Sequence, residues 1–133
     1  MKSSIIYYGI IPLGGSKMND YIINFLKEIM AIDSPSGYTK EVIHHCQKEA
    51  ENLGFHTHQT NKGNLEIYVE GQDDYTVGFC GHVDTLGLMV RSIKSDGTLA
   101  FTNVGGPIIP TLDGEYCRIH TRSGKCYTGT IIS

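Results

Sequence analysis

The sequence is short of several features, and each shortage excludes a class of protein. It has four cysteines, and none of them stands in a Cys-x-x-Cys pair, which excludes a zinc ribbon and a thioredoxin-like motif. Its 11 basic residues are outnumbered by 14 acidic ones, and the net charge is -3, so the basic footprint of a nucleic-acid-binding protein is missing. No internal repeat, low-complexity tract or charge block occurs. The composition is that of an ordinary globular domain without a nucleic-acid partner.

The apolar stretch at residues 4–13 is too short to span a membrane and lacks the cleavage site of a signal peptide. We therefore expect no membrane association. Met18 directly precedes a good helix start, so we expect residues 1–17 to be a non-native or disordered extension and translation to begin at Met18. Cys46 lies on a predicted helix face and Cys80 in a predicted buried strand. Free, reduced thiols at such positions favour a cytoplasmic location.

The first half of the chain has helical periodicity. A cap at Asn19 or Asp20 starts a predicted helix that ends near residue 32, and a second helix is predicted over residues 39–53. Gly54 stands where a left-handed residue ends such a helix. The predicted core-facing positions of the two helices are Ile22, Ile23, Leu26, Ile29 and Met30, then Val42, Ile43, Cys46, Ala50 and Leu53.

From residue 55 onward the period changes to two, which is typical of strands. The apolar run at residues 75–80 predicts a central strand, whereas the later segments predict hairpins with turns at residues 95–97 and 123–124. The other predicted strands are 55–60, 65–70, 86–93, 98–104, 115–120 and 127–132, with a turn at 61–64. Helices in one half and hairpins in the other predict two structural units, residues 18–86 and 87–133.

The triplet His82-Val83-Asp84 follows the predicted central strand. Residues i and i+2 of a strand point to the same side, so His82 could offer an imidazole nitrogen to a metal and Asp84 could orient that ring. The end of a central strand is also where α/β sheets bind their ligands. On its own, however, the motif is weak, and a structural histidine explains it better.

The surrounding sequence favours a metal-binding histidine over a structural one. Residues 81–90 resemble the first metal-site signature of metallopeptidase family forty-two, with the sequence Gly-His-Val-Asp-Thr-Leu-Gly-Leu-Met-Val. These are the glutamyl and deblocking aminopeptidases, which are often labelled endoglucanases. Many members carry Glu where this chain has Thr85. The resemblance runs from about Met18 to the last residue and includes segments 25–28, 34–37, 61–64, 104–106, 113–121 and 123–131.

The resemblance implies an α/β fold: part of an aminopeptidase catalytic domain, with helices and a mixed sheet, followed by part of an inserted all-β domain. It implies two divalent metal ions, zinc or cobalt, in the full-length enzyme, with His82 as a metal ligand and Asp84 as its supporting catalytic carboxylate. It also implies peptide substrates and self-association from dimers to a dodecamer.

The family has further ligands after this region: a bridging Asp, a Glu-Glu pair, another Asp and a final His. Nothing before Ser133 matches them, so we expect an N-terminal fragment that is inactive by itself, with at most an incomplete metal site. Two alternatives are a glycan hydrolase, for which no convincing carboxylate pair is visible, and a non-catalytic assembly module. Surface or packing roles are the simpler interpretation of the remaining histidines, His44, His45, His56, His58 and His120.

Overall fold

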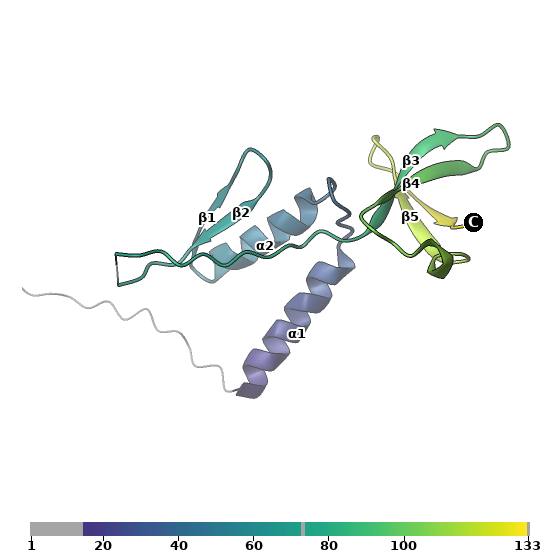
Figure 1. The fold of residues 1–133 in the computed structure, drawn as a ribbon. Coiled ribbons are helices and arrows are strands. Elements are labelled where there is room, and N and C mark those ends of the chain that lie inside the picture. Colours follow the sequence, from purple (N-terminus) through teal and green to yellow (C-terminus); the bar gives the residue numbers. More distant parts are fainter. Residues whose placement is uncertain (1–14, 73, 133) are drawn as a thin grey trace, which may run out of the picture. The chain divides into compact units, whose positions relative to one another are not determined.

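The computed structural model describes residues 15–72 and 74–132 (Figure 1). They divide into two compact units, which we describe separately. The first comprises the residues up to Asp33 together with Lys40–Val83, and the second comprises Ser34–Thr39 together with the residues from Asp84 onward. Of the predicted N-terminal extension, residues 1–14 lie outside the described part, and residues 15–17 belong to the first helix.

Helix α1 spans Gly15–Ala31 and therefore begins before the predicted cap. Asn19 and Asp20 lie inside the helix. Lys17 and Met18 are both good helix formers, so the helical conformation continues through them in the N-terminal direction. Its end agrees closely with the predicted end near residue 32.

Helix α2 spans Lys40–Asn52, as predicted, and its C-terminus is closed by two backbone hydrogen bonds. The amide of Gly54 donates to the carbonyl of Glu51 at 2.9 Å, and the amide of Phe55 donates to that of Ala50 at 3.0 Å. This is a Schellman motif, which requires a left-handed residue at the position of Gly54. The φ of Gly54 is 86°, and the predicted C-cap is thereby confirmed.

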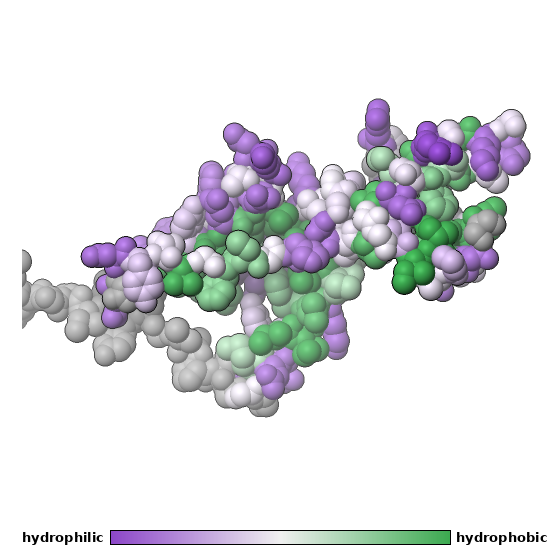
Figure 2. All heavy atoms as spheres, in the orientation of Figure 1, coloured by the Kyte–Doolittle hydropathy of each residue, from purple (hydrophilic) through white to green (hydrophobic). Residues whose placement is uncertain are grey.

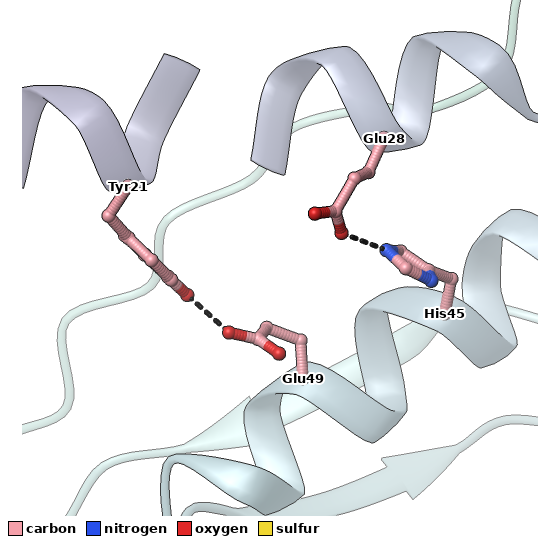
Figure 3. A network of polar contacts seen from close by, with 4 residues as sticks. All are labelled: Tyr21, Glu28, His45 and Glu49. Atoms are coloured by element: carbon pink, nitrogen blue, oxygen red, sulfur yellow. Dashed lines mark hydrogen bonds and ion pairs between the residues drawn. The ribbon is translucent and has the colours of Figure 1, made fainter. Parts of the chain in front are cut away.

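The contact between α1 and α2 is polar and aromatic (Figure 3). The hydroxyl of Tyr21 donates to Glu49 at 2.8 Å, and His45 Nε2 lies 3.1 Å from Glu28 Oε2. The Phe25 ring stacks on His45 with 5.7 Å between ring centroids. The turns of α1 that face α2 are thus occupied by Tyr21, Phe25 and Glu28.

Most of the predicted apolar stripe of α1 is exposed, and Ile29 alone among its five members is half-buried. Leu26 is 48% exposed and Met30 is 65% exposed. Figure 2 shows apolar residues at the molecular surface along this helix. The prediction that the stripe faces the core is therefore wrong for Ile22, Ile23, Leu26 and Met30 among the described residues, because the contacts with α2 are made by Tyr21, Phe25 and Glu28. The stripe of α2 agrees better, since Val42 and Ala50 are buried, although Leu53 is exposed.

Three antiparallel hairpins provide the sheet structure, and all three use the same loop. Strands β1 (His56–Gln59) and β2 (Leu65–Tyr68) pair in the first unit. In the second unit, β3 (Gly87–Ile93) pairs with β4 (Leu99–Val104), and β5 (Tyr116–His120) pairs with β6 (Cys126–Thr130). Each connection has five residues, and the amide of the first donates a hydrogen bond to the carbonyl of the fifth. The three residues between them end in a glycine with positive φ, which allows the strands to pair tightly. These glycines are Gly63, Gly97 and Gly124, with φ of 87°, 85° and 79°.

The predicted central strand at residues 75–80 is not formed among the described residues. Val77 and Phe79 are exposed, Phe79 by 95%, and Cys80 is exposed as well. A central strand needs hydrogen-bonding neighbours on both sides, and β1 and β2 pair only with each other. The apolar composition of the segment therefore predicted a strand whose partners are not supplied by the described residues.

The second unit closes where its last residues return to the start of β5. The amide of Ile131 donates to Glu115 at 2.9 Å, and that of Gly114 donates to Ile131 at 2.8 Å. Ile131 is buried at this junction. A short 3-10 helix, η1 (Ile109–Thr111), precedes it. Of the described residues, only Ser34, Val42, Ala50 and Ile131 are buried, so each unit has a small core.

Val42 is fully buried in α2, and its truncation tests how much of the first unit depends on that core. We expect Val42→Ala to lower the free energy of unfolding by roughly 1 to 3 kcal/mol, because it removes two buried methyl groups and leaves a cavity. Val69→Ala is the matched control, since Val69 is 72% exposed. Urea unfolding followed by circular dichroism measures both, and equal losses would contradict the assignment of the core.

Burial and the Glu49 carboxylate raise the pKa of Tyr21 to about 12, with a smaller contribution from Glu28. Because the folded pKa lies above the unfolded value of 10.0, the stabilisation is fully present below pH 10 and is lost as the pH rises through about 12. Tyr21→Phe removes this titrating group, so the difference in ultraviolet absorbance between the unchanged protein and Tyr21→Phe follows the ionisation of Tyr21 alone. We expect Glu49→Gln to lower the pKa toward 10 without reaching it, because burial remains. An unchanged titration in Glu49→Gln would show that the hydrogen bond has no such effect.

Candidate functional site

The two residues singled out by the sequence, His82 and Asp84, lie on either side of the division between the units. His82 is exposed and belongs to the last residues of the first unit, whereas Asp84 is half-buried and opens the second stretch of the second unit. His82 follows a segment without strand structure, so the expected placement at the end of a formed strand is not observed. Asp84 has well-defined surroundings within its own unit.

Those surroundings are built by the loop at residues 34–37, which forms a clamp on Asp84 and Thr85. The amide of Thr85 donates to the carbonyl of Ser34 at 2.8 Å. Pro35 and Thr85 form a parallel β-bridge, the one parallel pairing among the described residues. Ser34 is completely buried at this contact. The backbone on which Asp84 stands is thereby fixed next to a segment about fifty residues away.

The clamp has a defined turn because its sequence is Ser-Pro-Ser-Gly. The amide of Tyr38 donates to the carbonyl of Pro35 at 2.7 Å, and Gly37 has a φ of 88°. Gly37 is the third residue of this turn, and a positive φ at that position is the pattern of a type II turn, which favours glycine there. Pro35 also lies directly over Gly87, where an added Cβ would come within 2.5 Å of the proline Cβ.

Ser36, at the tip of the turn, donates a hydrogen bond from its hydroxyl to Oδ2 of Asp84. This contact gives the clamp a side-chain component directed at the candidate carboxylate. The loop at residues 34–37 is one of the segments that carry the family resemblance, but its sequence predicted no role for Ser36. No periodicity or spacing signal could have found it, because the contact joins residues 48 apart in the sequence.

Two of the other histidines make packing contacts within their own units. His45 is engaged with Glu28 and Phe25 in the interhelical contact. The His120 ring lies 5.2 Å from that of Tyr38, in agreement with a packing role. Burial raises the pKa of the Cys46 thiol, which makes it a weak nucleophile and supports its interpretation as a structural cysteine.

Comparison with known proteins identifies the family. A profile of the M42 glutamyl aminopeptidase family matches residues 63–133, more than half of the chain, and the match includes His82 and Asp84. The chain belongs to the M42 glutamyl aminopeptidase family. This confirms the resemblance that the sequence motifs indicated.

Two relatives of this M42 chain show the extent of the similarity. YhfE of Bacillus subtilis (strain 168), which is named as an aminopeptidase, is 40% identical over 111 residues, covering 83% of this chain and 32% of YhfE. The crystal structure of a TET aminopeptidase from the marine sediment archaeon Thaumarchaeota archaeon SCGC AB-539-E09 is similar with a TM-score of 0.78 and 28% identity. That match covers 86% of this chain and 32% of the archaeal one. The M42 chain thus spans about one third of the length of both relatives and has the predicted fold class, a partial α/β aminopeptidase domain.

No helix in the part of the M42 chain that the structure describes is long and apolar enough to cross a lipid bilayer.

The close approach of Pro35 to Gly87 allows the clamp to be tested by one added methyl group. We expect Gly87→Ala to push Pro35 away, to lower the free energy of unfolding by roughly 1 to 3 kcal/mol, and to speed hydrogen exchange at the Thr85 amide. Gly106→Ala is the control, because no atom lies within 4 Å of its added Cβ. If the Thr85 amide exchanges equally in both variants, the packing of Pro35 on Gly87 does not support the clamp.

Proposed function

We propose that this M42 chain is the N-terminal portion of a dinuclear-metal aminopeptidase that hydrolyses N-terminal residues from peptides. The observation that carries the proposal is the family match over residues 63–133, which includes the His-Val-Asp triplet at 82–84. The two relatives, both named as aminopeptidases, support the same reaction class.

In this proposal His82 contributes a metal ligand, and Asp84 orients its imidazole. His82 is exposed, so its ring is accessible to a metal ion. A neutral imidazole nitrogen is among the common ligands of zinc and of related divalent transition metals. A ligating histidine almost always donates its other ring N–H to a partner such as a carboxylate, the role that we assign to Asp84. The pair thus has the chemistry of one ligand of a zinc or cobalt site together with the hydrogen-bond partner of that ligand.

The described residues account only for this ligand and its hydrogen-bond partner. None of them form a group of three or more His, Cys, Asp or Glu side chains that could hold a metal ion. A catalytic zinc requires three protein ligands and an open position. We therefore propose that the other ligands and the general base come from polypeptide outside these residues, and that the 133-residue chain by itself has no peptidase activity. When bound, the two metal ions would supply Lewis-acid polarisation and an activated water.

Peptides with an accessible N-terminus are the proposed substrates, and we propose self-association from dimers to a dodecamer in the complete enzyme. For location we propose the cytoplasm. All four cysteines are free, at positions 46, 80, 117 and 126, and this supports a reducing compartment.

The test uses a hybrid protein, here called the YhfE hybrid, in which this chain replaces the matching segment of YhfE. We expect it to bind two equivalents of zinc or cobalt and to cleave an aminoacyl-anilide, whereas the 133-residue chain does neither. In the hybrid, His82→Ala should weaken zinc binding by more than about 100-fold and Asp84→Asn by about 10- to 100-fold, the range for groups that hold a ligand in place. Calorimetry with a competing chelator measures these affinities.

His44→Ala is the control, because His44 lies exposed on α2. Unmodified YhfE, measured in parallel, gives the zinc affinity and the peptidase activity with which the hybrid is compared. Zinc affinity that is insensitive to His82→Ala would remove His82 from the site. Activity that survives removal of all metal would contradict a metallo-aminopeptidase and favour a different hydrolase.

A further inference from the structure

We propose that Ser36 is a positioning residue for Asp84, so that the turn at residues 34–37 forms part of the site's machinery. The inference rests on the proposed function, because Asp84 is assigned there as the carboxylate that orients His82. It adds a residue whose contact with Asp84 the structure shows directly.

Hydrogen bonds on both sides of Ser36 limit the freedom of its backbone. On one side, Ser34 is buried and its carbonyl accepts the Thr85 amide at 2.8 Å. On the other side, the turn is closed by the 2.7 Å hydrogen bond from Tyr38 to Pro35. The pyrrolidine ring of Pro35, which directly precedes Ser36, fixes the φ of Pro35 itself. The backbone of Ser36 is thus fixed by its neighbours, and one side-chain torsion is left to decide where the hydroxyl points.

The hydroxyl points to Oδ2 of Asp84. Asp84 is itself next to Thr85, which pairs with Pro35 in the parallel bridge. The carboxylate and its hydrogen-bond donor are therefore mounted on two backbone segments that are bonded to each other. A carboxylate group offers about four acceptor positions on its two oxygens. A hydrogen bond from Ser36 therefore restricts the rotation of the group while leaving it capacity to accept a ring N–H.

Such restriction has a functional consequence. A group that orients a metal ligand works only if its own rotamer is held, and supporting residues around metal ligands commonly hold it. The hydrogen bond from Ser36 joins residues 48 positions apart, so it is not one of the bonds within the turn itself. The turn itself is already maintained by backbone hydrogen bonds, which the loss of one hydroxyl leaves in place.

The experiment is a double-mutant cycle in the YhfE hybrid, with zinc affinity as the readout. We expect Ser36→Ala to weaken zinc binding on the order of 10-fold, at the lower end of the range for supporting groups. Ser36→Thr keeps the hydroxyl and should restore binding close to that of the unchanged hybrid. In the Asp84→Asn background, Ser36→Ala should cause no further loss, because a residue that acts through Asp84 has nothing left to position. Ser123→Ala, in the β5–β6 loop, is the matched control.

The outcomes separate this inference from the proposed function. If Asp84→Asn weakens zinc binding while Ser36→Ala does not, or if the two losses add in the double variant, Ser36 has no positioning role. If neither His82→Ala nor Asp84→Asn alters zinc binding, the roles that the proposed function assigns to His82 and Asp84 fail, and Ser36 has no metal ligand to support. Where Ser36→Ala unfolds on thermal melting, Ser36→Gly, which also lacks the hydroxyl and is a residue that turns accept, takes its place with the same expected loss.

Discussion

The hydrogen bond from the Thr85 amide to the Ser34 carbonyl is the constraint on which the second unit depends. It brings a turn between the two helices next to the residues that lead into β3. This hydrogen bond closes a loop of about fifty residues between Ser34 and Thr85. Loop closure costs conformational entropy, although the cost grows only slowly with loop length. Burial of Ser34, the bridge between Pro35 and Thr85, and the fit of Pro35 against Gly87 offset it. Asp84 is thereby held through the backbone hydrogen bond of its neighbour Thr85 and through the hydroxyl of Ser36, without the help of a ligand.

The first unit is organised by a different kind of contact. Tyr21, Phe25 and Glu28 of α1 meet His45 and Glu49 of α2, so a polar and aromatic face joins the helices. The apolar stripe of α1 and the apolar residues of 75–80 remain at the surface of the described chain. Since the chain spans about one third of its relatives, these exposed apolar residues agree with a proposal in which further polypeptide completes the domain and its metal site.

Local signals in the sequence predicted the local structure well. The Schellman cap at Gly54 and the glycine-ended hairpin loops follow from the conformational freedom of glycine, and the structure has them where expected. The start of α1 was misjudged because Asn19 and Asp20 can cap a helix but can also lie inside one. The apolar stripe of α1 and the strand at 75–80 were misjudged for a common reason. An apolar composition shows that a segment is suited to burial or to strand pairing. Whether the segment is buried or paired depends on a partner in three dimensions, which the composition does not identify.

The candidate site was predictable only in part, for the same physical reason. The His-x-Asp spacing and the family resemblance identified His82 and Asp84, and the family match covers both. The clamp that fixes Asp84, including the hydroxyl of Ser36, depends on residues far apart in the sequence and could be found only in three dimensions. His82 does not end a formed strand, because segment 75–80 has no strand partner among the described residues.

The most direct test of the account is a crystal structure of the YhfE hybrid grown with zinc, with the metal located by anomalous scattering. The account predicts a zinc ion about 2.0–2.1 Å from an imidazole nitrogen of His82, with the other ring nitrogen donating to Asp84 and Asp84 still bonded to Ser36. A fully occupied zinc site that does not include His82 would contradict it.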